Sequence, residues 1–192
     1  MKIERKIRLS QCSLGSDTIN FVEDALSSTY LGMGEFVSEF ERLLTNYLGR
    51  EVITVNSGTT ALHLAIESLD LKSTDEIIAP SITYLSTFQA ILSAGVKPVA
   101  CDINENGQIC LESAKSLINP NTKAIIPVHY AGNSFDIKAL YKLAKENNLR
   151  VIEDAAHAFG SRYYGKLIGS FGDIVCFSFD GIKNITCGEG GA

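Results

Sequence analysis

The sequence lacks the features that mark membrane, secreted and metal-binding proteins. No uninterrupted apolar run approaches the roughly 18–20 residues of a membrane-spanning helix, and the opening MKIERKIR is too charged for a signal peptide. The five cysteines are an odd number, are widely spaced and include no Cys-x-x-Cys pair. That spacing suits neither a disulfide framework nor a zinc site. We therefore expect a cytoplasmic protein with free thiols and no metal ion.

A surplus of basic residues is also absent. The chain has 17 Lys and Arg against 22 Asp and Glu, which gives a net charge of −5. No basic field is available to attract nucleic acid or an acidic membrane, so neither is expected as a partner, although local donors can still hold an acidic ligand. With 45% hydrophobic and 20% charged residues, the 192-residue chain has the balance of a globular protein with a substantial core.

Short runs rich in valine and isoleucine alternate with amphipathic segments along the chain. This alternation is typical of βαβ units and predicts an α/β fold, a mainly parallel sheet flanked by helices. Strands are expected at 51–55, 76–79, 98–102, 123–128, 150–153 and 174–179. Helices are expected at 17–28, 35–48 (with Gly49 as its C-cap), 61–69, 83–93, 111–118 and 137–146.

The first candidate site follows the expected strand 51–55 and reads Ser57-Gly58-Thr59-Thr60. Ligands of parallel sheets bind beyond the carboxyl ends of the strands. Ser57 can cap the next helix, Gly58 permits close approach of a ligand, and free N–H groups at a helix start attract an anion such as phosphate. A plain capped turn is the alternative. The Walker A and Gly-x-Gly-x-x-Gly spacings are absent, which disfavours nucleoside triphosphates and dinucleotides.

Asp154 is the second candidate, because it ends the apolar run Val151-Ile152-Glu153. A carboxylate at the end of a buried strand costs several kcal/mol unless a cation meets it. A protonated pyridine nitrogen is a suitable partner, since the ion pair keeps the ring an electron sink. The alternative is an N-cap for the segment that follows.

The third candidate is the segment FSFDGIKN at 177–184, directly after the last expected strand. Ser178 can donate to a phosphate. Lys183 lies among small and apolar residues, where a partly desolvated amine suits covalent chemistry with a carbonyl. A solvated loop lysine is the alternative. Taken together, an anion cradle, a carboxylate, a hydroxyl and a lysine at successive strand ends are the equipment for binding pyridoxal 5′-phosphate (PLP).

Four motifs of the sequence occur together in the order of a known family: SGTTAL at 57–62, PVHYAG at 127–132, EDAAHA at 153–158, and FSF through Lys183 to GEGG at 177–191. With them the chain, from about residue 31 to residue 192, resembles the DegT/DnrJ/EryC1/StrS aminotransferases. The resemblance implies the large domain of a fold-type I PLP-dependent transferase.

The resemblance also assigns roles to single residues. Lys183 would hold PLP covalently and act as the general base, and Asp154 would hold the pyridinium nitrogen. Tyr84 would stack on the pyridine ring, with a core tyrosine as the alternative. His157 stands where the family has glutamine or histidine near the cofactor's phenolic oxygen, whereas His129 matches a family histidine without an assigned chemistry. The phosphate-binding residues would be Gly58, Thr59, Thr60 and Ser178, and His63 is expected to be structural.

Lysine at position 183 separates two branches of the family. The sugar dehydratases carry histidine there, so Lys183 favours transamination. The amino donor, usually L-glutamate in this family, would load the cofactor, and the amine would then pass to a keto group of a nucleotide-linked deoxysugar by ping-pong kinetics. Such a product would serve surface-polysaccharide or amino-sugar biosynthesis. A decarboxylase or lyase of the same fold type is disfavoured by GEGG at 188–191 and PVHY at 127–130.

Family members are typically about twice as long as this chain and form active sites across a homodimer. Residues 1–192 are therefore expected to be the N-terminal segment and most of the PLP-binding large domain, with the remainder and the C-terminal small domain missing. The glycine-rich end at 188–192, without a closing element, points the same way. The functional alternative is a fragment that binds the cofactor but is catalytically inactive.

Overall fold

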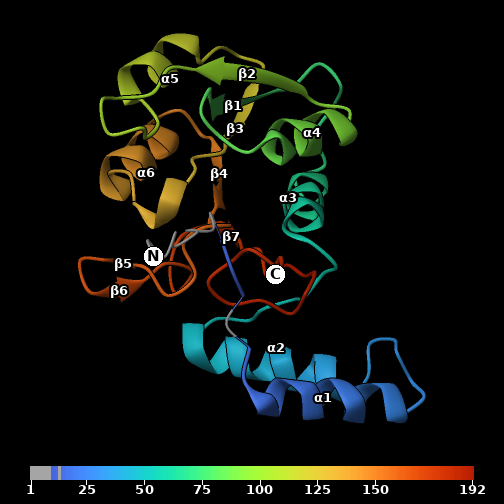
Figure 1. Cartoon of the computed structure of the whole chain (residues 1–192). Helices are drawn as coiled ribbons and strands as arrows, with labels where there is room; N and C mark the ends of the chain where they lie inside the picture. The colour runs from blue at the N-terminus through green and yellow to red at the C-terminus, as the bar shows by residue number, and fades with distance from the viewer. Residues whose placement is uncertain (1–9, 13) are drawn as a thin grey trace, which may run out of the picture.

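The structure is a computed structural model that describes residues 10–12 and 14–192. Its centre is a five-stranded sheet in the order β2-β1-β3-β4-β7, with every neighbouring pair parallel (Figure 1). The strands are β1 (Glu76–Pro80), β2 (Lys97–Cys101), β3 (Thr122–Ile125), β4 (Arg150–Asp154) and β7 (Ile174–Cys176). A separate antiparallel hairpin joins β5 (Arg162–Tyr163) to β6 (Lys166–Leu167).

Helices cover both faces of the sheet, as right-handed βαβ connections require. The helices are α1 (Ser16–Ser27), α2 (Glu35–Leu48), α3 (Gly58–Glu67), α4 (Leu85–Ser93), α5 (Leu111–Leu117) and α6 (Ile137–Glu146), with a 3-10 turn η1 (Tyr130–Gly132). Figure 1 shows α3 and α4 on one side of the sheet and α5 and α6 on the other.

Alternation along the strands builds two separate cores. On β1, Ile77 packs in the cluster formed with α3 and α4, while Ile78 packs in the cluster formed with α5 and α6. On β4, Ile152 and Val151 divide in the same way. All four side chains are at most 2% exposed. The predicted α/β class with a mainly parallel sheet is therefore confirmed.

The predicted strand at 51–55 is wrong. Only Val55 of this segment forms a bridge, antiparallel to Gly191, and the rest is irregular. Gly191 also bridges Ser178 beyond the end of β7, so residues 190–192 lie between two neighbouring backbones. Isoleucine and valine predict a strand only where a partner edge runs alongside, and most of 51–55 has none among the described residues.

Helix boundaries follow capping chemistry. Gly49 ends α2 with φ at 68°, and its N–H donates to the Thr45 carbonyl, as the sequence predicted. Ser57 caps α3, its Oγ accepting from the Thr60 N–H at 3.1 Å. The helix expected from residue 83 begins later, at Leu85, because Tyr84 is extended with ψ at 145°.

Two helices lie apart from the sheet. Figure 1 shows α1 and α2 side by side below the domain. Helix α2 buries Leu44 and Leu48 in the core, whereas α1 buries no residue. The apolar residues that α1 exposes are Ile19, Phe21, Val22 and Leu26. None of the helices within the described part of the chain is sufficiently long and apolar to traverse a bilayer.

The beginning of β4 is fixed to the turn before β7 by an ion pair. The Arg150 guanidinium donates two hydrogen bonds, of 2.7 and 2.8 Å, to the Asp173 carboxylate. Asp173 also accepts from the Val151 N–H at 3.1 Å. The hydrogen bonds from Arg150 lower the pKa of Asp173 below its ordinary value.

Candidate active site

The strand ends surround one cavity of about 380 Å³. Its walls come from the start of α3, the residues before α4, the segment after β3, the end of β4 and the segment after β7. The predicted site residues on this wall are Gly58, Thr59, Tyr84, Asp154, His157, Ser178 and Lys183. Parallel strands direct their carboxyl ends to one edge, which is why residues up to 125 positions apart in the chain meet here.

The start of α3 forms an anion cradle with Ser178. The first N–H groups of a helix have no intrahelical acceptor. The Ser57 hydroxyl accepts from the Thr60 N–H. The N–H groups of Gly58 and Thr59 remain available at the end of the helix that faces the cavity. A Cβ at Gly58 would stand 2.8 Å from the Cβ of Ser178, so only glycine permits this close approach. Thr60 does not line the cavity, because its hydroxyl bonds to Asn56 at 2.6 Å.

Asp154 is a buried carboxylate, 3% exposed, with two protein donors. Its Oδ2 accepts from the Thr87 hydroxyl at 2.8 Å, and its Oδ1 accepts from the Ala156 N–H at 3.1 Å. The second bond is the local cap considered as the alternative, so capping and site roles coexist. Among the described residues, Asp154 has no cationic partner, and a buried carboxylate in that state favours a positively charged ligand.

Lys183 and Tyr84 occupy the open part of the cavity. Lys183 is half-buried, and its N–H closes a turn onto the Asp180 carbonyl at 3.0 Å. Tyr84 is 73% exposed, so the alternative of a core tyrosine is wrong. An exposed aromatic ring beside a cavity is available for stacking on a planar ligand.

The two histidines near the site differ in environment. His157 lines the cavity, and burial together with the Lys183 ammonium lowers its pKa, against a smaller opposing effect of Asp154. His129 is completely buried, with Nε2 2.7 Å from the Glu153 carboxylate and Nδ1 3.2 Å from the Ser134 hydroxyl. His63 lies on α3 outside the cavity, 3.2 Å from Glu67.

Several residues at the site were not predicted. Thr87, which holds Asp154, is the most important of them. No local pattern of the sequence marks it, because its partner Asp154 lies 67 positions further along the chain. Other unpredicted residues on the cavity wall are Ser86, Val128, Tyr130, Asp180 and Glu189.

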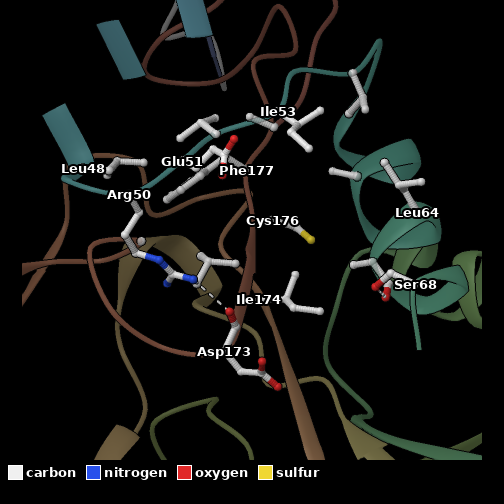
Figure 2. Close-up of a pocket in the computed structure, with 17 residues that line it drawn as sticks. Leu48, Arg50, Glu51, Ile53, Leu64, Ser68, Asp173, Ile174, Cys176 and Phe177 are labelled. Carbon is white, nitrogen blue, oxygen red and sulfur yellow. Dashed lines mark hydrogen bonds between the residues drawn. The ribbon is translucent and has the colours of Figure 1, made fainter. Parts of the chain in front are cut away.

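A second cavity, of about 350 Å³, holds none of the predicted residues (Figure 2). It lies between the edge strand β7, the segment 50–55 and helix α3. Its lining is mainly apolar, with Ile53, Leu64 and Ile174 among the labelled side chains. Arg50 reaches the Asp173 carbonyl at 2.9 Å from this side. The cavity's polar lining residues are Arg50, Glu51, Ser68 and Asp173, and none of the residues proposed for the reaction lies among them.

The fold and the position of the polar cavity define the class. A parallel α/β sheet of this topology, with a lysine, a carboxylate and an anion cradle at its strand ends, is the large domain of a fold-type I PLP-dependent transferase. The chain belongs to the DegT/DnrJ/EryC1/StrS aminotransferase family, whose model matches residues 13–192.

Three known proteins show the extent of the similarity. GDP-perosamine synthase of Caulobacter vibrioides is 40% identical over 190 residues, covering 97% of this chain and 51% of that protein. Helicobacter pylori PseC, an aminotransferase of pseudoaminic acid biosynthesis, has 34% identity and a TM-score of 0.92 over 97% of this chain and 51% of its own. The PLP form of Spr1654 from Streptococcus pneumoniae, a proposed sugar aminotransferase, has 32% identity and a TM-score of 0.92, with coverages of 97% and 52%. The chain thus spans about half the length of the relatives it matches.

Proposed function

We propose that the chain carries the PLP site of an aminotransferase that aminates a keto group of a nucleotide-linked deoxysugar. The observation that carries this proposal is the meeting of Lys183, Asp154 and the anion cradle at one cavity. Family membership and the names of the relatives support it.

The residues present fit the cofactor. Asp154, buried without a cation among the described residues, would bind the protonated pyridine nitrogen. Gly58, Thr59 and Ser178 would bind the phosphate, and Thr60 would fix the cradle through its N–H bond to Ser57. Tyr84 would stack on the ring, and Lys183 would hold the cofactor covalently. When bound, PLP supplies an electron sink that stabilises negative charge on the substrate carbon.

The protein's own side chains would move the proton and orient the groups around the cofactor. Lys183 would act as the general base that moves a proton between the substrate carbon and the C4′ carbon of the cofactor. Thr87 and the Ala156 N–H each donate a hydrogen bond to the Asp154 carboxylate and so fix its orientation. Burial and, in the cofactor-free chain, the Lys183 ammonium lower the pKa of His157, which favours the neutral form of its ring.

The substrates are inferred from the relatives. GDP-perosamine synthase is named for an amino sugar linked to GDP, and PseC for an amino sugar acid. We infer a nucleotide-linked keto sugar as acceptor and an amino acid, L-glutamate, as donor, in surface-polysaccharide or amino-sugar biosynthesis. The two half-reactions share one cavity, so the kinetics would be ping-pong.

We also propose that residues 1–192 make up the N-terminal segment and most of the large domain, with further polypeptide completing it. The support is the coverage of the relatives, since the chain matches 51% of the GDP-perosamine synthase of Caulobacter vibrioides and 51% of PseC.

We further propose that the protein forms a homodimer and is located in the cytoplasm. Helix α1 buries nothing while it exposes four large apolar side chains, which favours a partner surface there. The five cysteines are all free, and two of them, Cys101 and Cys176, are buried, as suits a reducing compartment.

The proposed function is tested by following 2-oxoglutarate release from L-glutamate, first in this chain and then in a form that continues to the length of the relatives. Asp154→Asn should retain PLP but lose most turnover, because the pyridine ring is no longer held protonated. Turnover at the wild-type rate in Asp154→Asn would show that the carboxylate is only a cap. PLP binding without turnover in both forms would support the inactive alternative.

A further inference from the structure

The turn η1 lies beside His157 and is held in an unusual backbone conformation. Ala131 has φ at 53°, in the left-handed region that a residue with a Cβ rarely adopts. Such a conformation costs about 1 kcal/mol or more and persists only where surrounding contacts enforce it. The turn is therefore held in place by its neighbours.

Contacts with the segment 157–161 provide part of that hold. The Ala131 N–H donates to Nδ1 of His157 at 3.2 Å. The Ser161 hydroxyl donates to the Gly132 carbonyl at 3.1 Å. A Cβ at Gly132 would stand 3.1 Å from the His157 carbonyl, at a φ of 78°. The Tyr130 ring meets the His157 ring edge to face, 5.8 Å between centroids.

The residue before the turn anchors it to β4. The His129 N–H donates to the Asp154 carbonyl at 3.0 Å, and its buried ring meets the Glu153 carboxylate. Glu153 is itself fixed by the Tyr141 hydroxyl at 2.7 Å. Consecutive side chains of a strand point to opposite faces of the sheet. At the end of β4, Glu153 therefore contacts the ring of His129 before the turn, while Asp154 points to the cavity.

The hydrogen bond to Nδ1 decides the protonation state of His157. A backbone N–H can only donate, so Nδ1 must accept and carry no proton. The neutral ring then holds its proton on Nε2, and Nε2 is the nitrogen left for a ligand in the cavity. Protonation of the ring would place an N–H on Nδ1 against the Ala131 N–H and break the contact.

We propose that the turn Tyr130–Gly132, anchored by His129 and Glu153, is a positioning device that holds His157 as a neutral imidazole with its proton on Nε2. The ionisable groups that share the cavity with His157 are Tyr84, Tyr130, Asp154, Asp180, Lys183 and Glu189. Burial and Lys183 act in the same direction as the turn, since both lower the pKa of His157. The effect of this state on cofactor binding rests on the proposed function, whereas the state of His157 itself does not.

The backbone amide of Ala131 reports this contact directly in the cofactor-free chain. Its proton shift should follow the titration of His157 and lose its hydrogen-bonded character as the ring protonates. His157→Leu should abolish the titration and speed hydrogen exchange of the Ala131 amide. His157→Gln should keep the amide protected, because the glutamine oxygen can accept while its NH₂ donates. His63→Gln is the matched control, since the chain has only three histidines.

Titration with PLP then tests whether the state that the turn imposes on His157 matters for cofactor binding. His157→Leu should bind about fivefold more weakly, the loss of one neutral hydrogen bond, while His157→Gln stays within about twofold of the wild type. An Ala131 amide that ignores the His157 titration, or equal PLP affinity in the leucine and wild-type chains, would overturn the proposal. If the wild-type chain binds no PLP, the proposed function of this chain fails, and the amide data alone still decide whether the turn holds His157 neutral.

Discussion

Replacement of Thr87 by valine removes the hydroxyl that contacts Asp154 and leaves the shape of the side chain nearly unchanged. Thr87 is completely buried, with Oγ1 2.8 Å from Asp154 and 2.7 Å from the Thr83 hydroxyl. Valine keeps the volume but leaves Asp154 with the Ala156 N–H as its one donor among the described residues. Hydrogen bonds to charged groups contribute about 1.5–3 kcal/mol, so the free energy of unfolding should fall by about 2 kcal/mol.

Urea unfolding of the cofactor-free chain measures this loss. With an m-value of about 2 kcal/mol/M, the midpoint should fall by about 1 M. Thr87→Ser is the matched control, because it keeps the donor and removes only a methyl group, at a cost of roughly 0.5–1.5 kcal/mol. PLP affinity should drop in the valine variant and not in the serine variant. A valine variant that unfolds and binds PLP like the wild type would refute the assignment of Thr87 as the residue that holds Asp154.

Three further perturbations test other parts of the structure. Gly58→Ala places a Cβ 2.8 Å from that of Ser178 and should cost about 1–3 kcal/mol of unfolding free energy and weaken PLP binding; unchanged values in urea and PLP titrations would contradict the tight cradle. Arg150 lowers the pKa of Asp173 below its ordinary value of 3.8, so the ion pair stabilises the fold above about pH 5 and this stabilisation is lost as the pH falls through the folded-state pKa. Asp173→Asn should therefore make the urea midpoint depend less on pH between about pH 5 and 3. An unchanged pH dependence of the midpoint would count against the ion pair. A maleimide should label exposed Cys12 in the native chain but Cys176, whose pKa burial raises, only in urea, and equal labelling rates would contradict the buried position.

Much of the fold follows from local sequence patterns. The alternation of valine and isoleucine runs with amphipathic segments predicts the parallel sheet, and Gly49 and Ser57 mark a helix end and a helix start as the structure has them. The segment 51–55 has the same composition as a strand, yet only Val55 pairs. Composition reports that a segment can pair, whereas pairing depends on a neighbouring edge that is distant in sequence.

In the candidate site too, local sequence patterns predict some residues and miss others. Asp154, Ser178 and Lys183 were predictable, because strand ends of a parallel sheet converge. The hydrogen bond from Thr87 joins residues 67 positions apart, and no local pattern encodes it. The conformation of Ala131 was equally hidden, since alanine carries no signal for a positive φ.

Borohydride trapping tests the central assignment most directly. The purified 192-residue chain is incubated with PLP, reduced, digested and analysed by mass spectrometry, with Lys183→Ala as the control. A phosphopyridoxyl group on Lys183, absent from the variant, is the predicted result and would show that these residues build the cofactor site. No label, or labels spread equally over surface lysines in both chains, would contradict the assignment of Lys183 in this chain.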